Sequence, residues 1–419
     1  MDPKSVLDVP GVLLTENAAI ADFGPRLFTD GVPDGITTVD CAGHVLAPGL
    51  VDMRVQLGEP GEEHKETTIT AARAAAAGGV TTMACLPNTD PVIDDAALVE
   101  MVKQRGREAG LVNILPYGAI TKGLAGEAMT EMGLLAAAGA VAFTDGTRAV
   151  ADAVMMRRAL SYASTFDLLI VQHPEEPSLA AGGDMNAGEI AVRLGLQGIP
   201  ACAELIMIER DLRLFETTGG RYHVPHISTA AAVDAIRQAK ARGLNVTCDT
   251  APPYFALNET AVGEYRTFAK LSPPLRGESD RLAIVEGLKD GTIDAIASDH
   301  APQDQESKRL PFHQAEPGSI GLETLLPLAL ELSHRGDVGL LDVLRVMTTA
   351  PAELLGLDAG AMRRGGPADL VLFDPDRPWK IEEKDFQSKS KNSAFEGRPV
   401  QGMSLRTVVA GRDVFNRDG

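Results

Sequence analysis

The sequence predicts an α/β protein: a (β/α)8 or TIM barrel that carries a small β-sandwich formed by the N- and C-terminal segments. Short apolar strands alternate with helix-length segments between residues 51 and 355, a pattern typical of parallel βα units. Eight strand candidates occur in this region, as a closed barrel needs. Residues 1–50 and 356–419 instead contain short alternating stretches and turns. Chain termini often lie close together, so both segments are predicted to form one sandwich domain.

The predicted barrel strands are short apolar runs. In chain order they are Val45–Val55, Val80–Leu86, Val112–Pro116, Val141–Phe143, Leu168–Val171, Tyr222–Ile227, Asn245–Cys248 and Ile293–Ala297. Active sites of such barrels lie at the carboxyl ends of the strands, so polar residues near these ends are candidate site residues. These candidates are Arg54, Gln56, Asn88, Asp145, His173, His226 and Asp299.

Alanine-rich segments that end at glycine indicate helices between the strands. Residues 71–77 lead into Gly78 and Gly79, and residues 136–138 lead into Gly139. Glycine commonly follows a helix because it readily adopts the left-handed conformation. Near the carboxyl end, residues 369–373 and 407–412 are predicted to form strands and turns of the sandwich.

Composition excludes several classes of partner. The formal net charge of −19 and the pI of about 4.9 argue against binding to nucleic acid or to an anionic membrane. No apolar run is long enough to cross a bilayer, and the first residues lack the features of a signal peptide. The cysteines form no CxxC pair and are predicted to be buried thiols in a reducing compartment, so we expect a cytoplasmic protein. They are Cys41, Cys85, Cys202 and Cys248.

One carboxylate and two imidazoles follow successive predicted strands and form a reasonable zinc-ligand set: Asp145, His173 and His226. Taken singly, each histidine could be a hydrogen-bonded structural residue, and the aspartate could cap a turn. Asp299 adds a second carboxylate that could act as a general base. Zinc lowers the pKa of bound water to about 7, so the resulting hydroxide could attack an amide. His223 lies further back in its strand and is expected to be structural.

Longer motifs resemble those of dihydroorotases, a family of the amidohydrolase superfamily, along nearly the full chain. The segments that carry this resemblance are Pro48–Asp52, Leu86–Asp95, Thr121–Leu124, Leu194–Pro200, Asp299–Pro302 and Gly318–Thr324. The Pro-Asn-Thr-x-Pro piece at residues 87–91 is the most specific of them. The resemblance implies a barrel with a small sandwich built from both termini, in agreement with the strand pattern.

The resemblance also implies roles for individual residues. Asp145 matches an acid that bridges two metals, and His173 and His226 match the histidines of the second metal. Asp299 matches the catalytic aspartate, and Asn88 matches an asparagine that contacts the substrate. The family therefore implies that Asp145 and Asp299 converge on one centre.

Several positions depart from the family pattern. Arg54 and Gln56 replace the histidine pair that holds the first metal, and Gly58 replaces the arginine that binds the substrate carboxylate. Ser272 replaces the asparagine before Pro-Pro-Leu-Arg, and Gln303 replaces the histidine after Asp-His-Ala-Pro. The surroundings of the site thus match the family, whereas several of its working residues have changed.

Among these changes, Arg54 has the largest expected effect, because it affects metal binding. Loss of the arginine at position 58 removes a charged hydrogen bond worth about 1.5–3 kcal/mol of binding free energy, which weakens substrate binding roughly 10- to 100-fold. An enzyme could remain active after such a loss. A guanidinium, however, only donates hydrogen bonds and stays protonated, so Arg54 cannot coordinate a cation and would repel Zn²⁺. If Asp145 and Asp299 converge, Arg54 could neutralise both carboxylates in place of the metal. We therefore expect either no cofactor or a single zinc.

Two main interpretations follow, a non-catalytic protein and an enzyme, together with a third, weaker one. The favoured one is a catalytically inactive dihydroorotase homologue of pyrimidine biosynthesis, and the resemblance to the inactive branch implies a structural role beside aspartate transcarbamoylase. The alternative is a cyclic amidohydrolase with one zinc at Asp145, His173 and His226 and with Asp299 as base. A third is ligand sensing through Asn88. Because dihydroorotases are commonly dimeric, self-association is also implied, and the polar loop of residues 303–317 could fold over the pocket.

Overall fold

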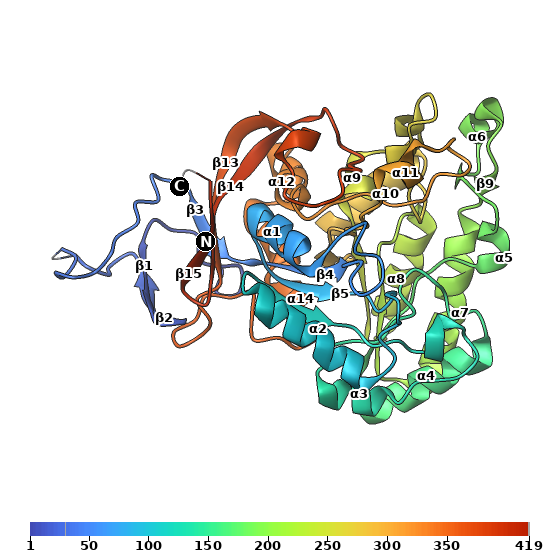
Figure 1. Cartoon of the computed structure of the whole chain (residues 1–419), viewed down its shortest axis with the longest axis horizontal. Helices are drawn as coiled ribbons and strands as arrows, with labels where there is room; N and C mark the ends of the chain where they lie inside the picture. The colour runs from blue at the N-terminus through green and yellow to red at the C-terminus, as the bar shows by residue number, and fades with distance from the viewer. Residues whose placement is uncertain (30, 418–419) are drawn as a thin grey trace.

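A computed structural model describes residues 1–29 and 31–417. It contains a parallel α/β barrel with an antiparallel sheet attached at one side (Figure 1). The predicted fold class is confirmed. Residues 30 and 418–419, which belong to the predicted sandwich segments, lie outside the described residues.

The barrel is built from two parallel sheets, with strand orders β4-β5-β6 and β12-β11-β10-β7. Each strand is short and largely buried, as expected for strands covered by helices on their outer face. The strands are β4 (Leu50–Val55), β5 (Val80–Cys85), β6 (Asn113–Pro116), β7 (Leu169–Val171), β10 (Arg221–Val224), β11 (Val246–Thr250) and β12 (Ala295–Ile296). A small parallel pair lies apart from them, β8 (Met185–Asn186) with β9 (Gly198–Ile199).

Isolated parallel bridges join the two sheets into a closed barrel. Phe143 bridges to Gly118 on one side and to Ile170 on the other, so the predicted strand at residues 141–143 fills the gap between β6 and β7. Val55 bridges to His300, which joins β4 to the end of the last strand. The carboxyl ends of these strands consequently surround one opening.

Helices cover the outside of the barrel, for example α2 against β6 and α8 against β11 (Figure 1). Of the predicted helix ends, α1 stops before Gly79 and α3 before Gly139, both in the left-handed conformation. The α-helices are α1 (Thr68–Gly78), α2 (Ala96–Ala109), α3 (Met132–Ala138), α4 (Ala153–Thr165), α5 (Pro177–Ala180), α6 (Glu189–Leu194), α7 (Cys202–Thr218), α8 (Ala230–Ala241), α9 (Pro252–Ala256), α10 (Glu278–Lys289), α11 (Gln305–Arg309), α12 (Leu325–His334), α13 (Leu340–Met347) and α14 (Thr349–Leu355). The 3₁₀ helices are η1 (Lys122–Leu124), η2 (Glu259–Val262), η3 (Thr267–Ala269) and η4 (Glu383–Asp385).

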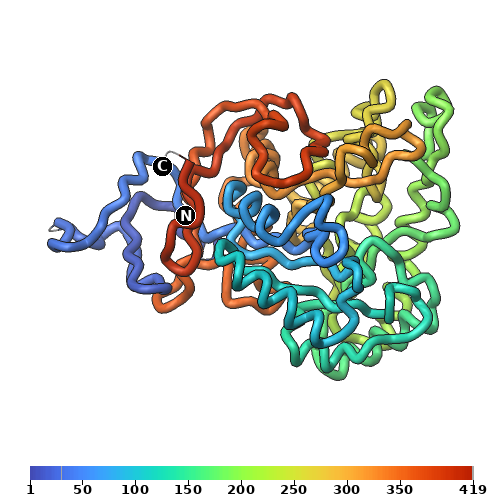
Figure 2. Tube along the Cα trace, in the orientation of Figure 1, coloured from blue at the N-terminus to red at the C-terminus, as the bar shows by residue number. Residues whose placement is uncertain are grey.

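The terminal segments combine into a small sandwich, because the amino-terminal strands lie beside the carboxyl-terminal ones (Figure 2). One layer is an antiparallel sheet in the order β15-β14-β13-β3, and the other is the hairpin β1-β2. Ile20 of the hairpin shares an apolar cluster with Leu370 of the sheet. The strands are β1 (Val12–Glu16), β2 (Ala19–Gly24), β3 (Val45–Pro48), β13 (Leu370–Lys380), β14 (Pro399–Val409) and β15 (Arg412–Asn416). The domain boundaries at residues 50 and 356 stay predictions.

The single strand predicted at residues 45–55 is in fact two strands. β3 pairs with β13 in the antiparallel sheet, whereas β4 pairs with β5 in the barrel. Gly49 separates them, and a side chain there would lie 2.1 Å from the Thr81 side chain. The apolar run is continuous, but the chain crosses from one sheet to the other at the position that has no room for a side chain.

All four cysteines are free thiols, but the prediction that they are buried is wrong for two of them. Cys85 and Cys248 are buried, Cys202 is exposed and Cys41 is partly exposed. Between residues 1 and 417, residue 30 aside, none of the helices combines the length and the apolar character needed to span a bilayer.

Candidate functional site

A cavity of about 670 Å³ opens at the carboxyl ends of the barrel strands. Its wall contains Arg54 and Gln56 from the end of β4, Asn88 from the segment after β5, and Asp299 from the segment after β12. Six of the predicted site positions therefore lie around one space, namely Arg54, Gln56, Asn88, Ser272, Asp299 and Gln303. The wall does not include Asp145, His173 or His226.

Arg54 points inward and forms an ion pair with Asp299. Its Nε donates to Asp299 Oδ1 at 2.8 Å, and its Nη2 donates to the Gly146 carbonyl at 3.3 Å. The arginine side chain is only 3% exposed and the aspartate side chain 16%. Burial raises the pKa of Asp299, while the charge and hydrogen bond of Arg54 oppose that rise. The predicted inward orientation of Arg54 is thus found.

Asp145 does not share this ion pair. One of its oxygens accepts hydrogen bonds from the backbone N–H groups of Ile120 and Thr121, at 3.0 and 2.9 Å, and the other accepts from the Thr121 hydroxyl. Arg54 instead reaches the carbonyl of the next residue, Gly146. The idea that Arg54 neutralises both carboxylates is therefore wrong for Asp145, because Thr121 and Ile120 satisfy that carboxylate. Burial raises the pKa of Asp145, against these hydrogen bonds.

The two predicted histidine ligands face each other. His173 Nδ1 lies 3.0 Å from His226 Nε2, and both side chains are buried. Burial lowers the pKa of His226 well below its ordinary value, and the charge of Arg54 lowers it further, so this imidazole is neutral. His226 and Asp299 both adopt positive φ angles, of 39° and 51°, which are uncommon for residues with a side chain. Such backbone strain is concentrated at functional sites.

These residues fit a zinc ion only in part. Two nitrogens 3.0 Å apart could occupy two corners of a tetrahedral site with Zn–N distances of about 2.0–2.1 Å. Across the described part of the chain, however, no group of three or more His, Cys, Asp or Glu side chains is arranged to hold a metal. The donor set as folded does not make the three-ligand site that a protein-bound zinc needs. The zinc set of Asp145, His173 and His226 stays a prediction.

Glu175, which the sequence patterns did not indicate, contacts both His173 and the cavity-lining Ser272. Its Oε2 lies 3.5 Å from His173 Nε2 and accepts a hydrogen bond from the Ser272 hydroxyl at 3.2 Å. Burial alone would raise the pKa of Glu175, but the hydrogen bond and charge of His173 bring it below the ordinary value. The only sequence signal for Glu175 as a site residue was its position two residues after His173.

The residues at the other positions that depart from the family pattern also fit their local surroundings. Gln56 Oε1 accepts a hydrogen bond from Asn88 Nδ2 at 3.1 Å, so these two amides pair within the cavity wall. Gly58 has a φ of 72°, and a Cβ there would lie 2.9 Å from the carbonyl oxygens of Glu62 and Glu66. An arginine at position 58 would therefore be strained in this backbone. Gln303 Nε2 donates to the Pro317 carbonyl at 3.1 Å.

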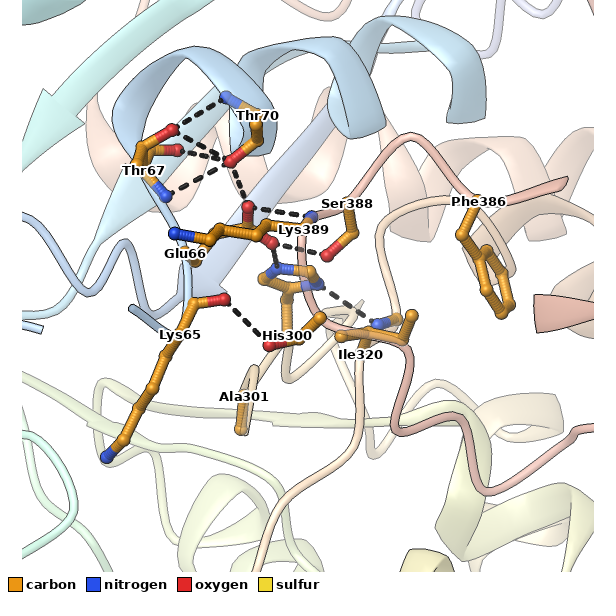
Figure 3. Close-up of polar contacts among 12 residues, drawn as sticks. Lys65, Glu66, Thr67, Thr70, His300, Ala301, Ile320, Phe386, Ser388 and Lys389 are labelled. Atoms are coloured by element: carbon orange, nitrogen blue, oxygen red, sulfur yellow. Dashed lines mark hydrogen bonds and ion pairs between the residues drawn. The ribbon is translucent and has the colours of Figure 1, made fainter. Parts of the chain in front are cut away.

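A second buried group, unmarked in the sequence, surrounds Glu66 and includes His300 (Figure 3). The carboxylate of Glu66 accepts hydrogen bonds from the Thr70 and Ser388 hydroxyls and, at 3.0 Å, from the Lys389 N–H. It also lies 3.5 Å from Nε2 of His300, the residue after Asp299. Burial alone would raise the pKa of Glu66, but the contact with His300 lowers it below the ordinary value. The sandwich segment that contains Ser388 is thereby tied to the site.

Comparison with known proteins identifies relatives of this chain. The family described as Dihydro-orotase-like matches residues 43–232. The chain is 49% identical over 424 aligned residues to a dihydroorotase from Anaplasma phagocytophilum (strain HZ), covering 100% of this chain and 94% of the relative. It is 47% identical to a dihydroorotase from Pelobacter propionicus (strain DSM 2379 / NBRC 103807 / OttBd1), covering 100% and 98% of the two chains.

Solved structures show the same architecture. L-Hydantoinase (dihydropyrimidinase) from Arthrobacter aurescens superimposes with a TM-score of 0.86 at 27% identity, over 97% of this chain and 92% of that one. Dihydropyrimidinase from Brevibacillus agri NCHU1002 superimposes with a TM-score of 0.83 at 22% identity, over 96% and 91% of the two chains. The second similarity concerns the fold alone.

Proposed function

Because the chain belongs to the dihydroorotase family of the amidohydrolase superfamily, we propose that it is a pyrimidine-pathway homologue without catalytic activity. In this proposal the chain serves as a structural partner of aspartate transcarbamoylase. Sequence similarity to relatives named dihydroorotase supports the pathway. The loss of the histidine pair at positions 54 and 56 supports the inactivity.

The observation that carries the proposal is the ion pair between Arg54 and Asp299, with Nε and Oδ1 2.8 Å apart. In an active enzyme Asp299 would have to accept a proton as base. Here a permanent cation occupies one carboxylate oxygen and opposes proton uptake by that carboxylate, although burial raises the pKa of Asp299 overall. The resemblance implies a ligand of the first metal at position 54, and a guanidinium there can supply no coordination bond. Both requirements of the reaction are therefore opposed by one side chain.

A second candidate function is a cyclic amidohydrolase with a single zinc. The observation in its favour is the 3.0 Å approach of His173 Nδ1 and His226 Nε2. This function requires the carboxylate of Asp145, which accepts hydrogen bonds from Thr121 and Ile120, to bind the ion as well. The charge of Arg54 near His226 opposes arrival of a cation.

Metal analysis and turnover measurements on the purified chain separate these functions. We expect no stoichiometric zinc and no hydrolysis of dihydroorotate or condensation of carbamoyl-aspartate. About one zinc per chain together with turnover would contradict inactivity and support the second function.

Matched variants sharpen the test. Arg54→His/Gln56→His restores the histidine pair without disturbing Gly58, and it should raise zinc content. Adding Gly58→Arg should lower stability, because the side chain would crowd the carbonyl oxygens of Glu62 and Glu66. Recovery of zinc without activity in the double variant would show that the remaining changes at Gly58, Ser272 and Gln303 also limit the reaction.

The proposed partnership has its own test. A tagged chain expressed in its native host should co-purify with aspartate transcarbamoylase, and an unrelated tagged protein of similar charge should not. Light scattering on the purified chain would measure the expected self-association. Absence of the transcarbamoylase from the purified complex would refute the partnership while leaving the inactivity untouched.

A further inference from the structure

The segment of residues 303–317 forms part of the cavity wall through Gln303, Glu316 and Pro317. It contains the short helix α11 and was expected from its polarity to be a loop that could fold over the pocket. In the structure, two buried lysines, Lys270 and Lys308, fasten it to the body of the protein. The two lysines meet different sets of acceptors.

Lys270 is bound as a charged ammonium. Its Nζ lies 3.2 Å from Asp184 Oδ1 and donates to the carbonyls of Phe312 and His313 at 2.8 and 2.9 Å. Three acceptors, one of them a carboxylate, match the three N–H bonds of an ammonium group. The side chain is 7% exposed, so this pairing is needed to compensate the buried charge.

Lys308 is bound differently. Its Nζ donates to the carbonyls of Thr267 and Glu316, at 3.0 and 2.6 Å, and has no carboxylate within 4.0 Å among the described residues. Two acceptors match the two N–H bonds of a neutral amine, and the third N–H of an ammonium would be left without a partner. The residue is only 4% exposed, so such a charge would be costly.

The charges around Lys308 reinforce this difference. Burial, and then the charge of Lys270, lower the pKa of Lys308 to about 7, while Glu316 of the same segment raises it in part. Asp184 does not compensate Lys308, because its carboxylate is held by Lys270 and by His313 Nδ1 at 3.1 Å. A neutral Lys308 is therefore compatible with the closed segment, whereas a charged one is repelled by Lys270.

We propose that Lys308 is a charge-sensitive latch that holds the segment of residues 303–317 against the cavity most firmly when uncharged and less firmly when protonated. The proposal does not depend on whether the site is catalytic. Because this segment supplies Gln303, Glu316 and Pro317 to the wall, its release would widen access to the cavity.

The direction of the pH dependence follows from linkage. Released into solvent, Lys308 would have the ordinary lysine pKa near 10.4, whereas in the closed segment its pKa is about 7. The open form then binds more protons between these values, so opening decreases by up to about tenfold for each pH unit above 7. Below pH 7 the residue is charged in both forms, and the opening equilibrium should level off at its maximum.

Amide hydrogen exchange of residues 305–316 in the full-length chain, corrected for intrinsic exchange rates, would test the latch. The wild type should show opening that falls up to about 100-fold between pH 7 and 9. Lys308→Met, which carries no charge, should lose this dependence. Lys308→Arg, charged throughout, should stay open-like at every pH. The control Lys289→Met removes an exposed lysine and should behave as the wild type.

Each outcome decides the proposal. A wild-type segment whose opening does not change between pH 7 and 9 would overturn it, even if no variant folds. Retention of the wild-type profile by Lys308→Met would overturn it as well, because another group would then control the segment. Loss of the profile in Lys308→Met, together with an open segment in Lys308→Arg, would support it.

Discussion

At the β4 side of the barrel opening, a fixed positive charge lies beside carboxylates: Arg54 contacts Asp299, and Asp52 lies behind it in the strand. At the β7 and β10 side, two imidazoles, those of His173 and His226, contact each other. The first side balances its charge with the chain's own guanidinium. The second side keeps two imidazoles that could bind a metal: His173 contacts both His226 and Glu175, whereas His226 Nδ1 has no hydrogen-bond partner among the described residues. The two sides thus differ in that the β4 side contains a buried ion pair with arginine, whereas the β7 and β10 side contains a pair of imidazoles.

The largest effect is expected when the counter-charge is removed. Arg54→Met should lower the free energy of unfolding by about 3–5 kcal/mol at neutral pH, because it leaves Asp299 ionised and unpaired in a largely buried position. The loss should be smaller at pH 5, where Asp299, whose pKa would rise further, can take up a proton. Urea denaturation at both pH values measures this. Arg54→Met/Asp299→Asn is the matched control and should recover much of the stability.

An intermediate effect is expected at Asp52. Burial raises its pKa to about 6, although hydrogen bonds from Ser298 and the Arg54 N–H oppose the rise. A raised pKa means that its contribution to stability is present below pH 3.8 and is lost as pH rises through 6. Asp52→Asn should remove this dependence, so its stability relative to the wild type should increase by up to about 3 kcal/mol between pH 4 and 7. An unchanged difference across this range would show that Asp52 is already ionised at pH 4.

The smallest effect is expected on the histidine side. Ser272→Ala removes the hydroxyl that donates to Glu175 Oε2, and should cost about 1 kcal/mol in the free energy of unfolding. The exposed Ser279→Ala is a suitable control and should stay within about 0.5 kcal/mol of the wild type. A loss at Ser272 as large as that at Arg54 would show that the two sides of the opening are equally dependent on charge pairing.

Much of the fold could be predicted from the sequence because strand and helix patterns are local. Apolar runs, alanine-rich helices and glycine ends located most barrel elements, and the sandwich strands followed from the terminal patterns. The division at Gly49 could not be predicted, since the apolar run through residues 45–55 is continuous. The contact with Thr81, which leaves no room for a side chain, exists only after the chain has folded.

For the candidate site, the convergence of the residues could be predicted from the sequence, but their individual contacts could not. Strand ends converge in any parallel barrel, so the order of the strands was enough to bring Arg54, Asn88 and Asp299 around one cavity. Which partner each side chain takes was not predictable. Asp145 accepts hydrogen bonds from Thr121, whereas Arg54 pairs with Asp299 and donates to the Gly146 carbonyl. Glu66 contacts His300 and the sandwich segment, but no sequence motif around residue 66 indicated this role.

By itself, the sequence determined the barrel, the sandwich and the sign of the charge at position 54, because each depends on residue type and spacing along the chain. Only the tertiary structure decided that Arg54 pairs with one aspartate rather than two, and that Lys308 meets two carbonyls while Lys270 meets a carboxylate. These choices depend on distances of about 3 Å between residues far apart in the chain, and hydrogen bonds weaken steeply beyond that range.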